Sequence, residues 1–279
     1  MFEISKRNLY INQFENITDL SIYLDRPRKQ GRNDASEHGS KSFTGTKNYK
    51  EAYDFLKYGD ENLYSTIKKE KEKLNIDKFL GNVSNRLRYE KRIYGAIPNV
   101  PAYLINNPIN MISPEKNQLS HRILNIFLDI GVCGGVGTDE IIRNGMLYLN
   151  VIDLLEKKGY RCNLYAGASS RCDDKNFYML VRVKTDREPL NMKKICFPLA
   201  SPSMLRRIFF RWEEVFDYDF DITNRNYGSD VELSCAVKQL NENLKQDFIV
   251  WSYNDGDGNS RTIETILDDL EEQGIKIKD

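Results

Sequence analysis

Several residue types on which active sites and structural cross-links depend are scarce in this sequence. It has two histidines, His38 and His121, which are too few to favour a zinc site or a catalytic triad that depends on histidine. Its five cysteines are odd in number and form no C-x-x-C pair, which is typical of reduced thiols. No apolar run is long enough to span a membrane, and the opening residues MFEISKRNLY lack the apolar core of a signal peptide. We therefore expect a cytoplasmic protein that has no membrane segment.

Net charge is also absent, because 41 basic residues balance 41 acidic ones. This balance excludes a whole-molecule field that would draw the chain to nucleic acid or to an anionic membrane. The charge is unevenly distributed, however: residues 1–100 carry 19 Lys and Arg against 14 Asp and Glu, whereas residues 213–279 carry 6 against 17. Such an asymmetry favours complementary protein surfaces over a nucleic-acid groove.

The N-terminal region, residues 1–118, is expected to be α-helical and rich in loops. Residues 26–48 contain almost no large apolar side chain, which indicates a long exposed loop or a mobile arm. Apolar residues then recur at helical spacing over 49–74 with a break at Gly59, so we expect two helices joined there. Four prolines over 95–115 predict an irregular connection to the second part of the chain.

Residues 119–279 show alternating strand and helix patterns. The near-continuous apolar run at 121–130 is typical of a central strand, and a glycine-rich turn leads to a helix that Thr138 or Asp139 caps and Gly159 ends. Further strands are expected at 160–168, 176–184, 247–255 and 275–279, with a polar turn at 169–175. Further helices are expected at 190–197, 203–216, 231–245 and 259–274, with breaks at Pro198 and Pro202 and a loop before residue 231. This alternation predicts an α/β domain with a mostly parallel sheet.

The order of these elements resembles a von Willebrand factor A-type, Rossmann-like domain, in particular the subgroup found in CobT-like cobaltochelatase proteins. In that family the first strand ends in D-x-S-x-S, which binds a divalent cation together with an aspartate from a later loop. Here Asp129 keeps the first place, but Gly131 and Cys133 replace both hydroxyls, and neither suits Mg²⁺. Asp255 and Asp257 match the later aspartate. The resemblance therefore implies a degenerate site, in which these three aspartates would hold any metal.

The whole chain also resembles a group of phage-encoded proteins of unknown function. Three boxes carry this resemblance: F-x-G-T-x-x-x-x-E-A (Phe43, Gly45, Thr46, Glu51, Ala52), G-x-x-P-x-V-P-A-Y-L (Gly95 to Leu104) and P-x-x-x-R-R (Pro202, Arg206, Arg207). The resemblance implies a location in the host cytoplasm. We expect Arg206 and Arg207, with Arg211, to lie on a solvated or ion-paired helix face beside Glu213 and Glu214.

We predict a non-enzymatic phage or prophage protein that acts as a protein-interaction module through this degenerate domain. No cofactor is expected, apart from the Mg²⁺ that a remnant site would take. CobT-like relatives work with AAA+ ATPases, so such an ATPase, or another phage or host protein, is the implied partner. The expected binding residues are Gly131, Cys133, Gly134, Gly135, Thr138, Arg206 and Arg207.

Two alternatives from other classes stay open. The first is a Mg²⁺-dependent phosphohydrolase with Asp129 as nucleophile and Asp255 or Asp257 as ligands, although Gly131 replaces the general acid that such enzymes use. The second is a nucleic-acid-binding protein that uses the basic arm 26–49, where cations and aromatic rings are interleaved. The glycine spacing G-x-x-G-G-x-G differs from the dinucleotide fingerprint, so a tight turn is favoured over a nucleotide site.

Overall fold

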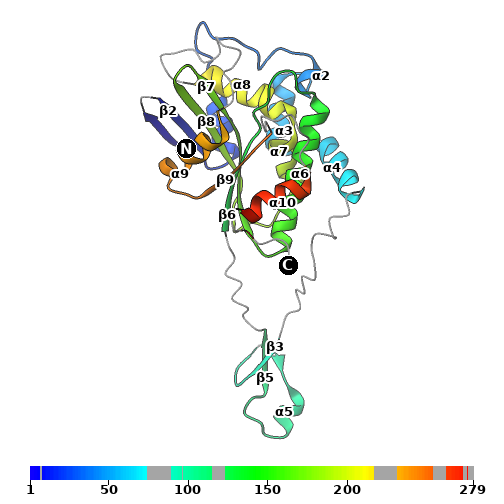
Figure 1. Ribbon diagram of the computed structural model, residues 1–279. Coiled ribbons are helices and arrows are strands. Elements are labelled where there is room, and N and C mark those ends of the chain that lie inside the picture. The colour runs from blue at the N-terminus through cyan, green and yellow to red at the C-terminus, as the bar shows by residue number, and fades with distance from the viewer. Residues whose placement is uncertain are drawn as a thin grey trace.

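A six-stranded, mostly parallel β-sheet organises the protein (Figure 1). The computed structural model describes residues 1–6, 8–73, 89–95, 97–114, 123–216, 231–253, 262–272 and 275. The strand order is β1-β2-β8-β7-β6-β9, and the pairings β2–β8, β7–β6 and β6–β9 are parallel. The bounds are β1 Phe2–Lys6, β2 Leu9–Phe14, β6 Ile123–Asp129, β7 Arg161–Cys172, β8 Lys175–Lys184 and β9 Phe248–Ser252. No described helix is long and apolar enough to cross a membrane.

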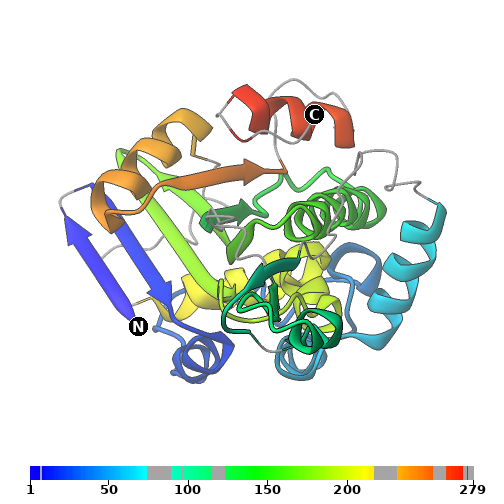
Figure 2. The ribbon, with the colours of Figure 1, turned by 90° about the horizontal axis from the view of Figure 1, so that it is seen from below.

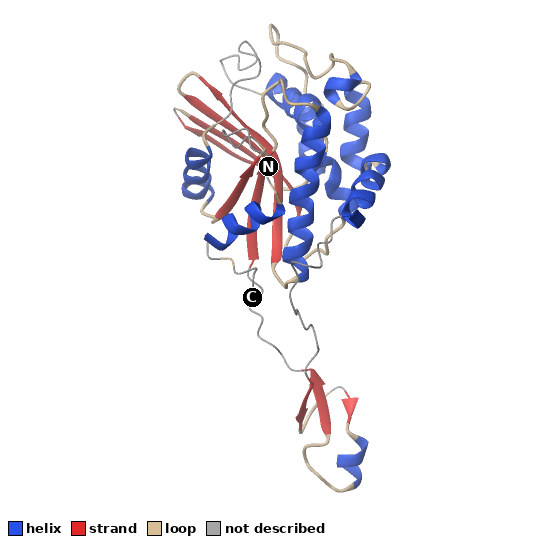
Figure 3. Ribbon diagram, turned by 45° about the vertical axis from the view of Figure 1, so that its right-hand side comes forward, coloured by secondary structure: helices blue, strands red, loops and turns tan. Residues whose placement is uncertain are grey.

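The predicted α/β class is therefore confirmed, with helices on both faces of the sheet (Figure 3). The larger core lies between the sheet and most of the helices, and the smaller core lies under α9. The helices are α1 Ile17–Leu24, α2 Lys41–Thr44, α3 Tyr49–Tyr58, α4 Glu61–Lys73, α5 Val100–Leu104, α6 Thr138–Lys157, α7 Met192–Ala200, α8 Phe210–Val215, α9 Leu233–Leu244 and α10 Ile263–Glu272, with a π-helical segment, η2, at Met204–Phe209.

The N-terminal region contributes two strands that its sequence pattern does not indicate. Strand β2 pairs in parallel with β8, and β1 pairs antiparallel with β2 at the edge of the sheet (Figure 2). All six residues of β2 are buried, including the polar residues Asn12 and Gln13. These two polar residues interrupt the apolar run by which a strand buried on both faces is recognised.

The helix ends predicted at Gly59 and Gly159 are confirmed. Helix α3 ends at Gly59, whose positive φ of 86° glycine adopts without steric cost, and α4 then begins at Glu61. Helix α6 ends before Gly159, whose φ is 92°. Its first residue is Thr138, but Gly137 occupies the capping position and no side chain caps the helix, so the predicted cap is wrong.

Two expected interruptions of regular structure are wrong. Helix α7 continues through Pro198 to Ala200, because a proline near the last turn removes only one helical hydrogen bond. The turn expected at 169–175 consists of Asp173 and Asp174 alone, because β7 extends to Cys172 and β8 begins at Lys175. The polar residue Ser169 is tolerated inside this buried strand because its hydroxyl donates a hydrogen bond to Asp129.

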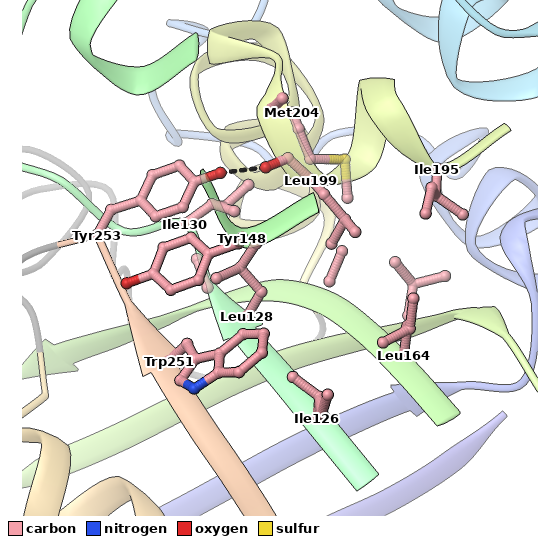
Figure 4. Close-up of a cluster of buried hydrophobic side chains, with 14 of the residues drawn as sticks. Ile126, Leu128, Ile130, Tyr148, Leu164, Ile195, Leu199, Met204, Trp251 and Tyr253 are labelled. Atoms are coloured by element: carbon pink, nitrogen blue, oxygen red, sulfur yellow. Dashed lines mark hydrogen bonds between the residues drawn. The ribbon is translucent and has the colours of Figure 1, made fainter. Parts of the chain in front are cut away.

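An aromatic stack attaches β9 to the large core (Figure 4). The Tyr148 ring stacks on Trp251 with 5.2 Å between centroids and on Tyr253 with 5.6 Å. The Tyr253 hydroxyl donates a hydrogen bond to the Leu199 carbonyl of α7, and the Tyr148 hydroxyl donates to the Ser252 carbonyl at 2.8 Å. Burial raises the pKa of Tyr253, so this hydroxyl remains a donor. The stack thus connects α6 and α7 to the last strand of the sheet.

The proline-rich segment expected to be irregular forms a small sheet of its own. Its strands are β3 Tyr89–Arg92, β4 Ile97–Pro98 and β5 Met111–Pro114, in the order β3-β5-β4, with α5 between β4 and β5. Two of its prolines stand where proline is tolerated. Pro98 lies on an edge strand and Pro101 in the first turn of α5.

Candidate binding surface at the carboxyl edge of the sheet

Asp129 ends the central strand β6 and orients the turn that follows it. Its side chain is 5% exposed. One carboxylate oxygen accepts a hydrogen bond from the Gly131 amide at 2.9 Å, and both oxygens accept from the Ser169 amide at 3.2 Å. The Ser169 hydroxyl donates to the same carboxylate and accepts from the Val231 amide at 3.4 Å. The carboxylate therefore joins β6, β7 and the start of the segment that leads to α9.

The other two aspartates of the predicted metal site, Asp255 and Asp257, lie outside the described residues. Within the described part of the chain, no group of three or more His, Cys, Asp or Glu side chains is close enough to hold a metal ion. The metal site and the phosphohydrolase alternative both depend on these two residues, so they stay predictions.

The glycine-rich loop 131–137 joins β6 to α6 at this edge of the sheet. Gly131 is buried, whereas Cys133, Gly134 and Gly135 are exposed and Thr138 is half-buried. The Gly135 amide donates to the Cys133 thiol at 3.4 Å. A Cβ atom built on Gly134 meets no atom within 4 Å, so close packing does not require glycine there. The tip of the loop is thus an open surface without charged side chains.

Arg206 connects this glycine-rich loop to the N-terminal loop. Its guanidinium donates to the Val136 carbonyl and to the Phe43 carbonyl, both at 2.6 Å, and lies 3.9 Å from the centre of the Phe43 ring. The side chain is 1% exposed, so the prediction of a solvated face is wrong for Arg206. Burial lowers its pKa, and the two carbonyl oxygens and the ring face compensate part of the desolvation.

Arg207, which is fully buried, also anchors the N-terminal loop. Its closest bonds are to the carbonyls of Ser36 at 2.9 Å and His38 at 2.8 Å. It also donates to the Gly39, Thr46 and Lys47 carbonyls and to the Thr44 hydroxyl, at 3.1–3.4 Å. The solvated-face prediction is therefore wrong for Arg207 as well. Apart from the Thr44 hydroxyl, its partners are main-chain oxygens of one folded loop.

The acidic neighbours of these arginines are also buried and hold the same loop. Glu213 and Glu214 are both 0% exposed. The Glu214 carboxylate accepts from the Ser36 amide at 2.9 Å and from the Ser36 hydroxyl at 2.6 Å. Arg211 lies 3.7 Å from Glu214, so the predicted ion pairing is confirmed for Arg211. Neither Arg206 nor Arg207 forms an ion pair with a carboxylate of the described residues.

The N-terminal loop is consequently anchored, although many of its side chains are exposed, and the mobile-arm prediction is wrong. Ser36, Thr44 and Thr46 are buried, and a short helix, α2, interrupts the loop. Part of its positive charge is neutralised inside the loop, since Arg28 lies 3.2 Å from Asp34. These contacts add no support to a nucleic-acid groove, which needs several unpaired cations aligned on one face.

Two of the three sequence boxes, the first and the third, contact each other in the folded protein. Phe43 and Thr46 of the first box contact Arg206 and Arg207 of the third. Gly45 adopts a φ of 86°, and a Cβ built on it would lie 3.2 Å from the Ser203 hydroxyl. The spacing of both boxes therefore reflects packing between segments about 160 residues apart. Sequence analysis missed Ser36 and Ser169, because isolated serines give no signal of their own.

No curated protein and no solved structure matches this chain. A family model described as "Domain of unknown function (DUF7192)" matches residues 3–275, so the chain belongs to that family.

Proposed function

We propose that the protein is a non-enzymatic binding module whose carboxyl sheet edge receives a protein partner. The recognition surface consists of the exposed tip of the glycine-rich loop, Cys133 to Gly135, and the adjoining N-terminal loop, residues 36–47. The observation that carries the proposal is the Arg206 bridge, which joins the two loops through their carbonyls at 2.6 Å. Loops held in one arrangement before binding lose less conformational entropy on association.

The chemistry of the surface supports recognition better than catalysis. The Asp129 carboxylate is buried and accepts hydrogen bonds from two main-chain amides and the Ser169 hydroxyl. The neighbouring loop tip offers a thiol and bare main chain. The carboxyl edge of a parallel sheet is also the edge at which ligands of α/β proteins usually bind.

We further propose that the α/β domain is von Willebrand A-like and of phage or prophage origin. The first part is supported by the βα unit β6–α6, whose strand ends in Asp129, and by the placement of β6 between β7 and β9. The second part is supported by the sequence boxes alone. On this resemblance, an AAA+ ATPase is the first partner to test.

The test compares two variants that introduce the same side chain at opposite edges of the sheet. Gly134→Arg enlarges the loop tip where nothing lies within 4 Å, and Glu242→Arg changes an exposed residue near the end of α9. Partners captured from cells by the native protein should bind Gly134→Arg about tenfold more weakly, which is about 1.4 kcal/mol. Glu242→Arg should bind as the native protein does.

Two results would overturn the proposal. One is equal capture by both variants, because the loop tip would then lie outside the interface. The other is Mg²⁺-dependent hydrolysis of a phosphoester by the purified protein that Asp129→Asn abolishes, because this result would establish the hydrolase alternative.

A further inference from the structure

The small sheet β3-β5-β4 with α5, residues 89–95 and 97–114, is called here the small module. From Ile93 to Pro114 its sequence contains no charged residue, although 29% of the whole chain is charged. The charged residues of the module are Glu90, Lys91 and Arg92, all on β3; Lys91 is exposed and Arg92 is half-buried. Beyond β3, the module thus presents an uncharged surface in an otherwise highly charged protein.

The large apolar side chains of the small module are exposed. The exposed fractions are Ile93 71%, Tyr94 72%, Ile97 47%, Val100 55%, Tyr103 66%, Leu104 74%, Ile105 76% and Ile109 44%. Among the module residues whose burial the structure describes, Ala102 alone is buried. The module therefore has no apolar core of its own.

A unit of this size without a core gains stability only by packing against something else. Domains below about 40 residues usually need a disulfide, a metal or association with another chain. All five cysteines lie outside the module, so a disulfide within it is excluded. Contiguous exposed apolar surface on a soluble protein is typical of an interaction site.

We propose that a second copy of this chain covers the small module and forms a two-fold symmetric dimer. An uncharged apolar surface meets its own copy without like-charge repulsion and without burying an unpaired charge. Taking about 200 Å² for a fully exposed large side chain, the exposed fractions correspond to about 1,000 Å². This area is comparable with the roughly 800 Å² that each partner buries in a standard interface.

The edges of the small sheet indicate how the two copies meet. Pro98 on β4 has no main-chain N–H to donate to a further strand. Strand β3 at the other edge carries Glu90, Lys91 and Arg92, and charged side chains on an edge strand oppose pairing between chains. We therefore place the two-fold axis at α5, where Tyr103, Leu104 and Ile105 are exposed and uncharged.

The test is the oligomeric state of the full chain, measured by sedimentation velocity over a wide concentration range. The native protein should dimerise, and Leu104→Glu or Ile105→Glu should raise the dimer dissociation constant at least about tenfold. Ile22→Glu is the matched control, because Ile22 is 64% exposed on α1, outside the module. Because all three residues are exposed, none of these substitutions should unfold the protein.

A second measurement locates the axis. Tyr103→Cys in a Cys133→Ser background should form a disulfide-linked dimer under mild oxidation, and adding Leu104→Glu should suppress it. A native protein that stays monomeric, or a dimer that Leu104→Glu weakens no more than Ile22→Glu does, would overturn the proposal. So would a monomer that binds phosphatidylcholine–phosphatidylserine vesicles through Leu104, because a membrane would then be the occupant. Gly134→Arg should leave the dimer unchanged, which separates this inference from the proposed function.

Discussion

Replacing Arg207 with methionine should lower the free energy of unfolding by about 3 to 5 kcal/mol. Methionine keeps a long apolar side chain but donates no hydrogen bond. The two best bonds that are lost, to the Ser36 and His38 carbonyls, measure 2.9 and 2.8 Å. Each bond from a charged donor contributes about 1.5 to 3 kcal/mol, and the longer bonds to Gly39 and Thr46 add little.

The assay is urea denaturation with linear extrapolation, paired with limited trypsin digestion of the folded protein. The anchored loop carries exposed lysines at positions 41 and 47, so loss of the anchor should accelerate cleavage there before the sheet unfolds. Arg207→Lys keeps the charge but loses the forked donor geometry, and it should fall between the native protein and Arg207→Met. Arg143→Met, on an exposed site of α6, is the control and should change stability by less than about 0.5 kcal/mol.

The reasoning would be refuted if Arg207→Met and Arg143→Met had the same urea midpoint. Equal rates of tryptic cleavage in the two variants would refute it as well, because the loop would then be held by other contacts.

The remaining predictions concern a close helix contact and the buried thiols. Gly145→Ala should destabilise the protein by about 2 kcal/mol, because the added Cβ would lie 2.4 Å from the Cα atom of Ala200. Gly134→Ala meets nothing within 4 Å and should leave the melting temperature unchanged. The exposed Cys133 should react with a maleimide in the folded protein. Cys196 should react only after unfolding, because it is buried and burial raises the pKa of its thiol to about 11. Mass spectrometry of labelled peptides measures both reactions. Since the unfolded chain releases this thiol proton near pH 9 and the folded chain retains it, the urea midpoint should fall as pH rises from 9 towards 11. A Cys196 that labels as fast as Cys133, or a Gly145→Ala variant as stable as the native protein, would contradict these expectations.

Local sequence signals account for the parts of the fold that were predicted. The β6 run, the glycine-rich loop and the long helix α6 follow from apolar periodicity and glycine placement within about 40 consecutive residues. The same holds for α3 and α4, which a glycine at positive φ separates. The position of Asp129 at the end of β6 also follows from the sequence.

Contacts between segments distant in the sequence determined features of the fold that local sequence patterns do not specify. The sequence itself determined the α/β class, the balanced but uneven charge and the uncharged stretch after Arg92. It did not reveal that β2 would pair with β8, or that Arg206 and Arg207 would be buried among carbonyls about 160 residues away. Arginine on a helix normally faces water, so its burial depends on a loop that supplies several oxygen acceptors at once. Such an arrangement exists only once the tertiary structure has formed, because no local pattern specifies acceptors from a distant segment.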